Sequence, residues 1–181
     1  LVVSATAFEV DGRELDSVDA ADLKTLPCLW KMIKSAVAKK APAKKGRVLV
    51  ADSKVVHAQA DGVKLLERGV LAFVGTLEEA VGPLDVVGLM KLLGCVDHEL
   101  EAHPWYPRSG GAPLPWLGDP GDLAIARNML QGAMAAAHVR TVCMRTAVVS
   151  ERAFNRLVDG TRNKASALIS VTFRHLHYLH H

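Results

Sequence analysis

The chain has 181 residues, of which 50% are hydrophobic and 23% charged, so it can bury the core of one ordinary domain. Its net charge of +3 does not by itself indicate a polyanion partner, and its longest apolar stretches are interrupted well short of a membrane-spanning length. Three widely spaced cysteines indicate neither a disulfide framework nor a zinc site. We therefore expect a cytoplasmic protein without a membrane partner.

The first half of the chain predicts strands and helices in alternation. Residues 1–10 are rich in Val, Ala, Thr and Phe, which is typical of a strand. Apolar residues at helical spacing predict a helix over 19–37, and a short apolar run at 46–51 predicts a buried strand. A further helix is expected over 62–74, with Asp61 as its N-cap.

The second half continues the alternation. A short apolar helix is expected over 84–93, an alanine-rich helix over 121–138 and a strand over 139–149. Two more helices are expected, over 151–158 and from 163 towards the C-terminus. Strands that alternate with helices favour the α/β class.

The last two helices have recognisable ends and core positions. Ser150 is expected to cap the helix 151–158, and Asp159-Gly160 to end it. The expected core positions of the last helix are Leu168, Val171, Leu176 and Leu179.

A Pro/Gly/Trp-rich loop is predicted at about 103–120, where five of the eight prolines lie. Its aromatic residues Trp105, Tyr106 and Trp116, together with Arg108, have two interpretations. They offer stacking surfaces for unpaired bases, or they anchor the loop in the core. We favour anchoring, because a loop this rich in proline needs apolar residues to fix it.

A basic cluster follows the first predicted helix. It consists of Lys39, Lys40, Lys44, Lys45 and Arg47. Such a cluster can touch phosphate, but alanine and proline lie among the lysines, and a solvated linker is the simpler interpretation.

Two groups of residues contain potential metal ligands. His177 and His181 are four residues apart on a predicted helix, a spacing that can bind a transition metal, but nothing nearby completes the site. The second group lies just before and at the start of the predicted loop, and its side chains are expected to be exposed to solvent. The remaining members of the two groups are His175 and His180 at the C-terminus, and Asp97, His98, Glu99, Glu101 and His103 beside the loop.

Several segments follow a pattern known from one nuclease family. The apolar run 48–54 ends in Asp-Ser-Lys, and a leucine-rich stretch with an arginine follows at 65–71. Together they resemble the Asp-Ser-Lys segment and the next helix of the type 2 ribonuclease H family, the ribonuclease HII/HIII-like enzymes. Residues 1–7 are similar to that family's second strand, and 148–155 with 163–168 are similar to the stretch before its third catalytic strand.

The resemblance implies a ribonuclease H-like fold, an α/β mixed sheet flanked by helices and incomplete at both termini. It makes 1–181 a single domain within a longer protein, with a subgroup insertion over 76–120. The intact parent would be a monomeric endoribonuclease that uses Mg²⁺ or Mn²⁺ to cleave the RNA strand of RNA/DNA hybrids.

The family's metal-holding carboxylates would lie outside this chain. Its adjacent Asp-Glu pair would precede Leu1, and the other two carboxylates would follow His181. We therefore assign no catalytic residue and no metal or cofactor within the chain, and we expect the chain alone to be inactive.

The resemblance implies nucleic-acid-binding roles for Asp52, Ser53, Lys54, Asn163 and Lys164. Each of these positions also has a structural interpretation, because Asp-Ser-Lys makes a turn and a helix start and Asn163 can cap a helix.

Two other functions stay open. The first is a noncatalytic nucleic-acid-binding module of the same fold, which would use the lysine cluster and the tryptophan loop. The second is a metalloprotein built on the C-terminal histidines. The sequence contains no Walker-type phosphate loop and no Ser or Cys nucleophile motif.

Overall fold

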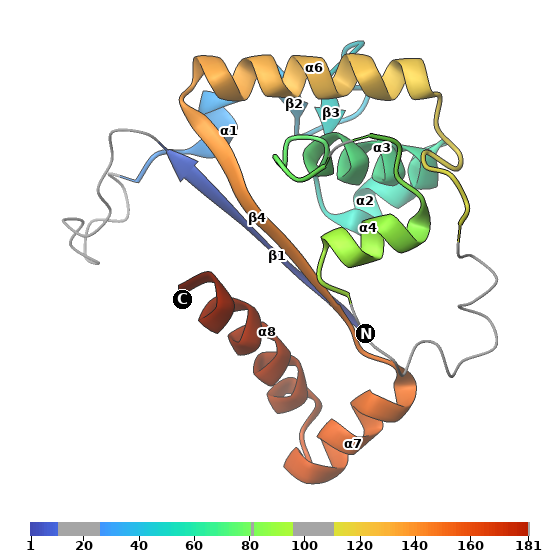
Figure 1. The fold of residues 1–181 in the computed structure, drawn as a ribbon, viewed down its shortest axis with the longest axis vertical. Coiled ribbons are helices and arrows are strands. Elements are labelled where there is room, and N and C mark those ends of the chain that lie inside the picture. The colour runs from blue at the N-terminus through green and yellow to red at the C-terminus, as the bar shows by residue number, and fades with distance from the viewer. Residues whose placement is uncertain (11–25, 81, 96–110, 181) are drawn as a thin grey trace. The chain divides into compact units, whose positions relative to one another are not determined.

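The computed structural model describes residues 1–10, 26–80, 82–95 and 111–180 (Figure 1). These residues form seven helices and four strands, so the protein belongs to the α/β class. The chain divides into two compact units. Unit 1 comprises 1–7, 79–114 and 142–181, and unit 2 comprises 8–78 and 115–141.

Most elements lie where they were expected, but β2 was not predicted. The strands are β1 (Val2–Val10), β2 (Val37–Ala38), β3 (Val48–Leu49) and β4 (Val139–Val148). The helices are α1 (Leu29–Met32), α2 (Ser53–His57), α3 (Gly62–Val74), α4 (Val86–Leu92), α6 (Pro120–Ala136), α7 (Glu151–Thr161) and α8 (Lys164–His180). Within the described residues, β1 pairs with β4 and β2 pairs with β3, as two separate two-stranded sheets.

Side-chain caps set the starts of most helices. The carboxylate of Asp119 accepts a hydrogen bond from the backbone N–H of Asp122 at the start of α6, at 2.7 Å. Asp85 caps α4 in the same way, and Ser150 caps α7 as predicted. Asp61 precedes α3 as predicted, but its side chain makes no capping hydrogen bond. Short polar side chains therefore cap these helices, as Ser150 was predicted to do.

The helix predicted over 19–37 is largely wrong within the described residues. Only Leu29–Met32 is helical, and Val37 belongs to β2. The backbone N–H of Val48 donates to the carbonyl of Ala36, and that of Val50 donates to Ala38. Pairing with β3 thus outweighs the helical spacing of the apolar residues, because strand preference depends on the neighbours that a segment meets.

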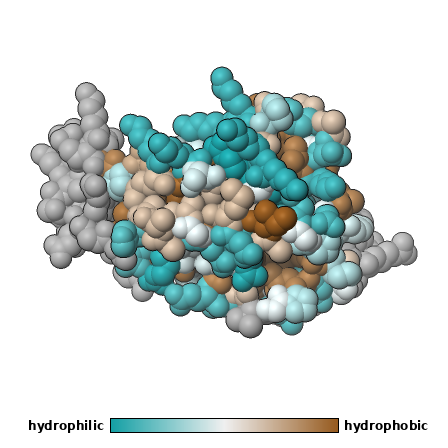
Figure 2. All heavy atoms as spheres, turned by 90° about the horizontal axis from the view of Figure 1, so that it is seen from above, coloured by the Kyte–Doolittle hydropathy of each residue, from teal (hydrophilic) through white to brown (hydrophobic). Residues whose placement is uncertain are grey.

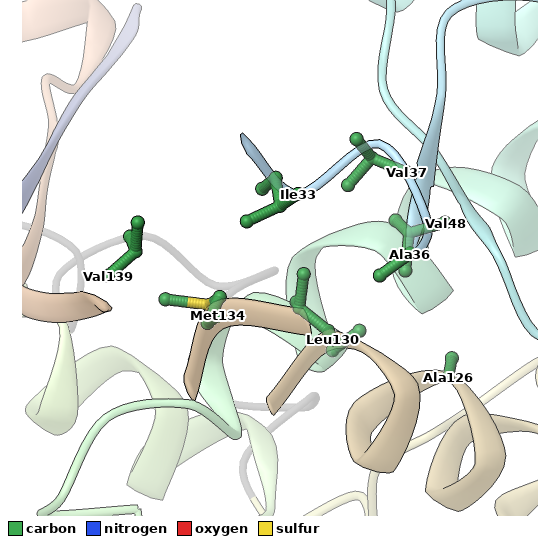
Figure 3. Packing of buried hydrophobic residues seen from close by; sticks show 9 residues of the cluster. Ile33, Ala36, Val37, Val48, Ala126, Leu130, Met134 and Val139 are labelled. Carbon is green, nitrogen blue, oxygen red and sulfur yellow. The ribbon is translucent and has the colours of Figure 1, made fainter. Parts of the chain in front are cut away.

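The core of unit 2 lies between α6 and the short β2–β3 pair. Ala126, Leu130 and Met134, each four residues apart, form one buried face of α6. They pack with Val48 of β3 and Val37 of β2 (Figure 3). The outer side of α6 carries hydrophilic residues around small apolar patches (Figure 2). This division between a buried and a solvated face is what an amphipathic helix requires.

Arg68 joins three parts of unit 2. Its side chain is 11% exposed and forms an ion pair with Asp122 of α6 at 2.6 Å. It also donates to the backbone carbonyl of Arg47, just before β3, at 2.8 Å. An arginine at this depth is stable only when its donors are paired, so Arg68 fixes α3, α6 and the start of β3 together.

Helix α7 is longer than predicted. It continues through Asp159-Gly160 to Thr161 and is followed by its C-cap Arg162, whose φ of 51° is left-handed. A glycine inside a helix is tolerated, so the expected stop at Asp159-Gly160 was wrong. Asn163 then caps α8 by accepting from the backbone N–H of Ala165 at 2.8 Å.

The core face of α8 also differs from the prediction. Val171 is buried as expected, but Leu168 and Leu176 are 43% and 52% exposed. The buried face consists of Ala167, Val171 and His175, spaced four residues apart. Helix α8 carries apolar residues on more than one side, so spacing alone did not identify the side that packs.

Gly46 has a left-handed backbone that favours glycine and little room for a side chain. Its φ is 82°, and a Cβ there would collide with the sulfur of Met129 and lie 3.3 Å from Cγ2 of Ile125. We expect Gly46→Ala to lower the free energy of unfolding by about 2 kcal/mol or more, through the left-handed backbone and the steric overlap. Urea denaturation measures this change.

Gly132 is the matched control, because it lies inside α6 and a Cβ there meets nothing within 4 Å. Gly132→Ala should raise the free energy of unfolding by about 0.5–1 kcal/mol. Equal effects of the two substitutions would contradict this account of Gly46.

Candidate nucleic-acid interface

The candidate site lies where β2 and β3 end. The two strands are parallel, with Val37 opposite Val48 and Ala38 opposite Leu49. Both strands therefore leave the pair at the same edge, which is where parallel α/β sheets bind their ligands. This carboxyl edge consists of Lys39 and Lys40 after β2, and Asp52, Ser53 and Lys54 after β3.

The side chains of the carboxyl edge are exposed although the strands that lead to them are buried. The ammonium of Lys39 lies 4.6 Å from the centre of the Trp30 ring, a cation–π contact that restrains this lysine. Lys40 and Lys54 extend into solvent. The edge thus presents three ammonium groups.

Asp52 has a structural role at this edge. Its Oδ1 accepts a hydrogen bond from the backbone N–H of Lys54 at 2.9 Å, which caps α2. Ser53 is the first residue of that helix. The capping role considered in the sequence analysis is therefore present, and a binding role for Asp52, Ser53 and Lys54 stays a prediction.

The basic cluster divides into two kinds of residue. Lys44 and Lys45 are exposed, as a solvated segment requires. Arg47 is turned inward, and its Nη2 donates to the carbonyls of Lys34, at 2.7 Å, and of Val37. Arg47 therefore fixes the end of the cluster to the chain before β2, and only the lysines are left to meet a ligand.

Trp116 does not anchor the loop, contrary to the prediction, because its side chain is 68% exposed. The anchor is Glu67 of α3, whose carboxylate accepts from the backbone N–H groups of Trp116, Leu117 and Gly118. The last two distances are 2.9 and 2.8 Å. A carboxylate with several amide donors holds a backbone firmly, so this segment does not need its indole buried. The other ring residues of the loop, and Arg108, lie outside the described residues.

Asn163 and Lys164 belong to unit 1, whereas the carboxyl edge belongs to unit 2. Asn163 caps α8, which gives it a structural role, and the Lys164 side chain is exposed.

The described residues contain no group of three or more His, Cys, Asp or Glu side chains placed to hold a metal ion. His175 is buried, and its Nε2 lies 3.1 Å from the carbonyl oxygen of Val3. The side chain of His180, His181 and the group from Asp97 to His103 lie outside the described part of the chain.

The partly buried cysteines are poor nucleophiles. Burial raises the pKa of the Cys95 and Cys143 thiols above its ordinary value, and the nearby Arg145 guanidinium offsets only part of this effect. Both thiols therefore stay protonated at neutral pH, whereas the thiolate is the reactive form.

The role of Glu67 was not predicted, because nothing in the sequence around a single glutamate of a leucine-rich helix indicates that it binds the backbone at 116–118. Comparison of the chain with protein-family models, curated proteins and solved structures finds no match. Among the described residues, every helix is too short or too polar to cross a membrane.

Substitutions at Asp52 separate its capping role from any binding role. Asp52→Ala removes the acceptor for the Lys54 N–H and should lower the free energy of unfolding by about 1 kcal/mol. Asp52→Asn keeps a side-chain oxygen and should stay within a few tenths of a kcal/mol of the wild type. Thermal and urea unfolding measure both effects, and equal losses in the two variants would mean that the cap is not what Asp52 contributes.

Proposed function

We propose that the chain is part of a ribonuclease H-type nuclease, a metal-dependent endoribonuclease that cleaves the RNA strand of RNA/DNA hybrids. In this proposal the described strands belong to a ribonuclease H-like mixed sheet, and the carboxyl edge of unit 2 contacts the nucleic acid. The supporting observation is the parallel pairing of β2 and β3, which brings Lys39 and Lys40 to the same edge as the Asp52-Ser53-Lys54 segment.

The chemistry of the edge suits a phosphate backbone. Its three lysines and one aspartate give a formal charge of +2, and Lys44 and Lys45 add exposed positive charge in the same unit. Lysines attract phosphates as mobile point charges and do not read base sequence. Such contacts fit an enzyme that recognises a hybrid duplex by shape and backbone.

The described residues do not supply the metal site of such an enzyme. They contain no suitable group of ligands, and the Asp52 carboxylate is engaged as a cap. In the proposal the carboxylates that hold Mg²⁺ or Mn²⁺ lie outside the 181 residues, and bound metal would activate water and stabilise the leaving oxygen. No catalytic step is assigned to a residue of this chain.

A noncatalytic nucleic-acid-binding module is the second candidate. The exposed Trp116 ring favours it, because Glu67 holds the backbone of Trp116 while the ring is left open to stack on a base. This candidate predicts salt-sensitive binding of nucleic acid without cleavage.

Cleavage separates the two candidates. The protein with its flanking coding sequence should cleave the RNA strand of an RNA/DNA hybrid when Mg²⁺ or Mn²⁺ is present and not after chelation, because the metal activates the attacking water. The 181-residue chain alone should not cleave. Denaturing gel analysis of an end-labelled hybrid measures this. Tight hybrid binding by the longer protein without cleavage would reject the nuclease and leave the binding module.

Binding by the carboxyl edge is tested separately in the 181-residue chain. Lys40→Gln and Lys54→Gln should each weaken binding of an RNA/DNA hybrid and lower the slope of log K against log salt by up to about 0.9, the release of one counterion. Fluorescence anisotropy at several salt concentrations measures both quantities.

Lys91→Gln serves as the control, since Lys91 is exposed on α4 and belongs to unit 1, whereas the carboxyl edge belongs to unit 2. An equal loss for Lys91→Gln would show that net charge, and not this edge, determines binding.

A further inference from the structure

Helix α8 of unit 1 has two apolar sides, and only one of them is buried in the protein. Ala167, Val171 and His175 form the buried side. Nε2 of His175 lies 3.1 Å from the carbonyl oxygen of Val3 in β1, and Figure 1 shows α8 running alongside that strand. The packing of α8 on the rest of unit 1 therefore uses one row of side chains, spaced four residues apart.

The second apolar side of α8 is exposed to solvent. Ile169, Phe173 and Leu176 are 50%, 62% and 52% exposed, and Leu168 beside them is 43% exposed. Residues at i, i+4 and i+7 lie on one face of a helix, so these side chains form a continuous row. Thr172 lies in the same row, and its hydroxyl donates to the carbonyl of Leu168 at 3.1 Å, so its polar group is satisfied by the helix itself. We call these five residues the α8 stripe.

The form of the α8 stripe suits a helical partner. Single exposed apolar residues are common on protein surfaces, whereas contiguous ones mark surfaces that bind another molecule. The row from Ile169 to Leu176 is straight and about two turns long. A second helix that presents apolar residues at the same spacing can pack its row against this one.

The charge of α8 indicates which kind of helix fits. Its 17 residues include Lys164 and Arg174 and contain no aspartate or glutamate. Lys164 lies one turn before Leu168 of the stripe, and Arg174 follows Phe173. Neither cation forms an ion pair within the described part of the chain. Carboxylates that flank the apolar row of a partner helix would therefore meet cations without an opposing charge, which favours and steers association.

A second copy of the chain fits the α8 stripe less well. Two α8 helices could bring their apolar rows together, but each would contribute basic residues and no carboxylate to the contact. Like charges across an interface act against a partner, and opposite charges select it. The charge of α8 therefore favours a different, acidic partner.

We propose that the α8 stripe binds an acidic amphipathic helix of a partner protein. The apolar residues of that helix pack against Ile169, Phe173 and Leu176, and its carboxylates lie towards Lys164 and Arg174. The stripe shares no residue with the carboxyl edge and belongs to the other unit, so the proposal does not rest on the proposed nuclease function.

Binding of three fluorescein-labelled synthetic peptides to the 181-residue chain tests the proposal. The first peptide is helical, with leucines repeating at i, i+4 and i+7 and glutamates beside them. The second has lysines in place of the glutamates, and the third has the composition of the first with the leucines scattered. Fluorescence anisotropy should show the first binding at least about tenfold more tightly than the others, because only it matches both the stripe and the cations. Equal binding of the first and third peptides, or no binding of the first at millimolar concentration, would overturn the proposal.

Substitutions in the stripe locate the binding surface. Phe173→Gln should weaken binding of the first peptide about tenfold, because it removes the most exposed apolar side chain of the stripe, and Ile169→Gln should act in the same direction. Circular dichroism and thermal unfolding check that both variants are folded. Val63→Gln is the matched control, since Val63 is 52% exposed on α3 in unit 2. Equal losses for Val63→Gln and Phe173→Gln would reject the stripe as the binding surface.

Substitutions of the cations test the acidic character of the partner. Lys164→Gln and Arg174→Gln should each weaken binding of the first peptide about two- to fivefold at low salt and less at high salt. Lys64→Gln is the control, since Lys64 is exposed on α3 in unit 2. An unchanged affinity when both Lys164 and Arg174 are replaced would overturn the assignment of an acidic partner.

Sedimentation of the 181-residue chain alone tests the other occupant. The chain should sediment as a monomer across a range of concentrations, because its α8 helices offer each other no opposite charge. A dimer that Phe173→Gln dissociates would overturn the acidic partner and assign the stripe to a second copy of the chain.

Discussion

The position of β3, and with it the carboxyl edge, depends on the buried end of Arg68. Its guanidinium reaches Asp122 of α6 and the carbonyl of Arg47 at the entry to β3, so one side chain of α3 fixes two neighbouring elements. Asp122 is 42% exposed, and solvent therefore weakens the charge attraction of the pair. The contribution of Arg68 is mainly geometric. It satisfies a backbone carbonyl beside a two-residue strand that has few hydrogen bonds of its own.

The basic residues of the two units are held in different ways. Lysines on the carboxyl edge of unit 2 are exposed on flexible stems, which suits a long polyanion whose phosphates move along the surface. In unit 1, Arg145 is fixed between Tyr178 and Gly94. The cations of the two units therefore differ in exposure and rigidity.

Local chemistry predicted much of this fold. The caps at Asp52 and Ser150 and the limits of α3 follow from short-range rules that the residues carry wherever they lie. Long-range contacts account for the failures. Val37 is in a strand because β3 lies beside it, and Trp116 is exposed because Glu67 binds its backbone from about 50 positions away. The ribonuclease H-like fold and function stay predictions, since they concern an arrangement of strands that no local pattern determines.

Asp52 illustrates how a capping residue orients the surface beside it. By accepting the N–H of Lys54 it fixes the turn from β3 into α2, and so sets the direction in which Lys54 leaves the edge. Trp30 restrains Lys39 on the neighbouring strand. The side chain of Lys39 and the backbone of Lys54 are thus both restrained, and in the proposed interface this would reduce the entropy lost on binding phosphates. The negative charge of Asp52 would weaken the attraction of the edge for an anion slightly, but its cap fixes the backbone from which the Lys54 side chain extends.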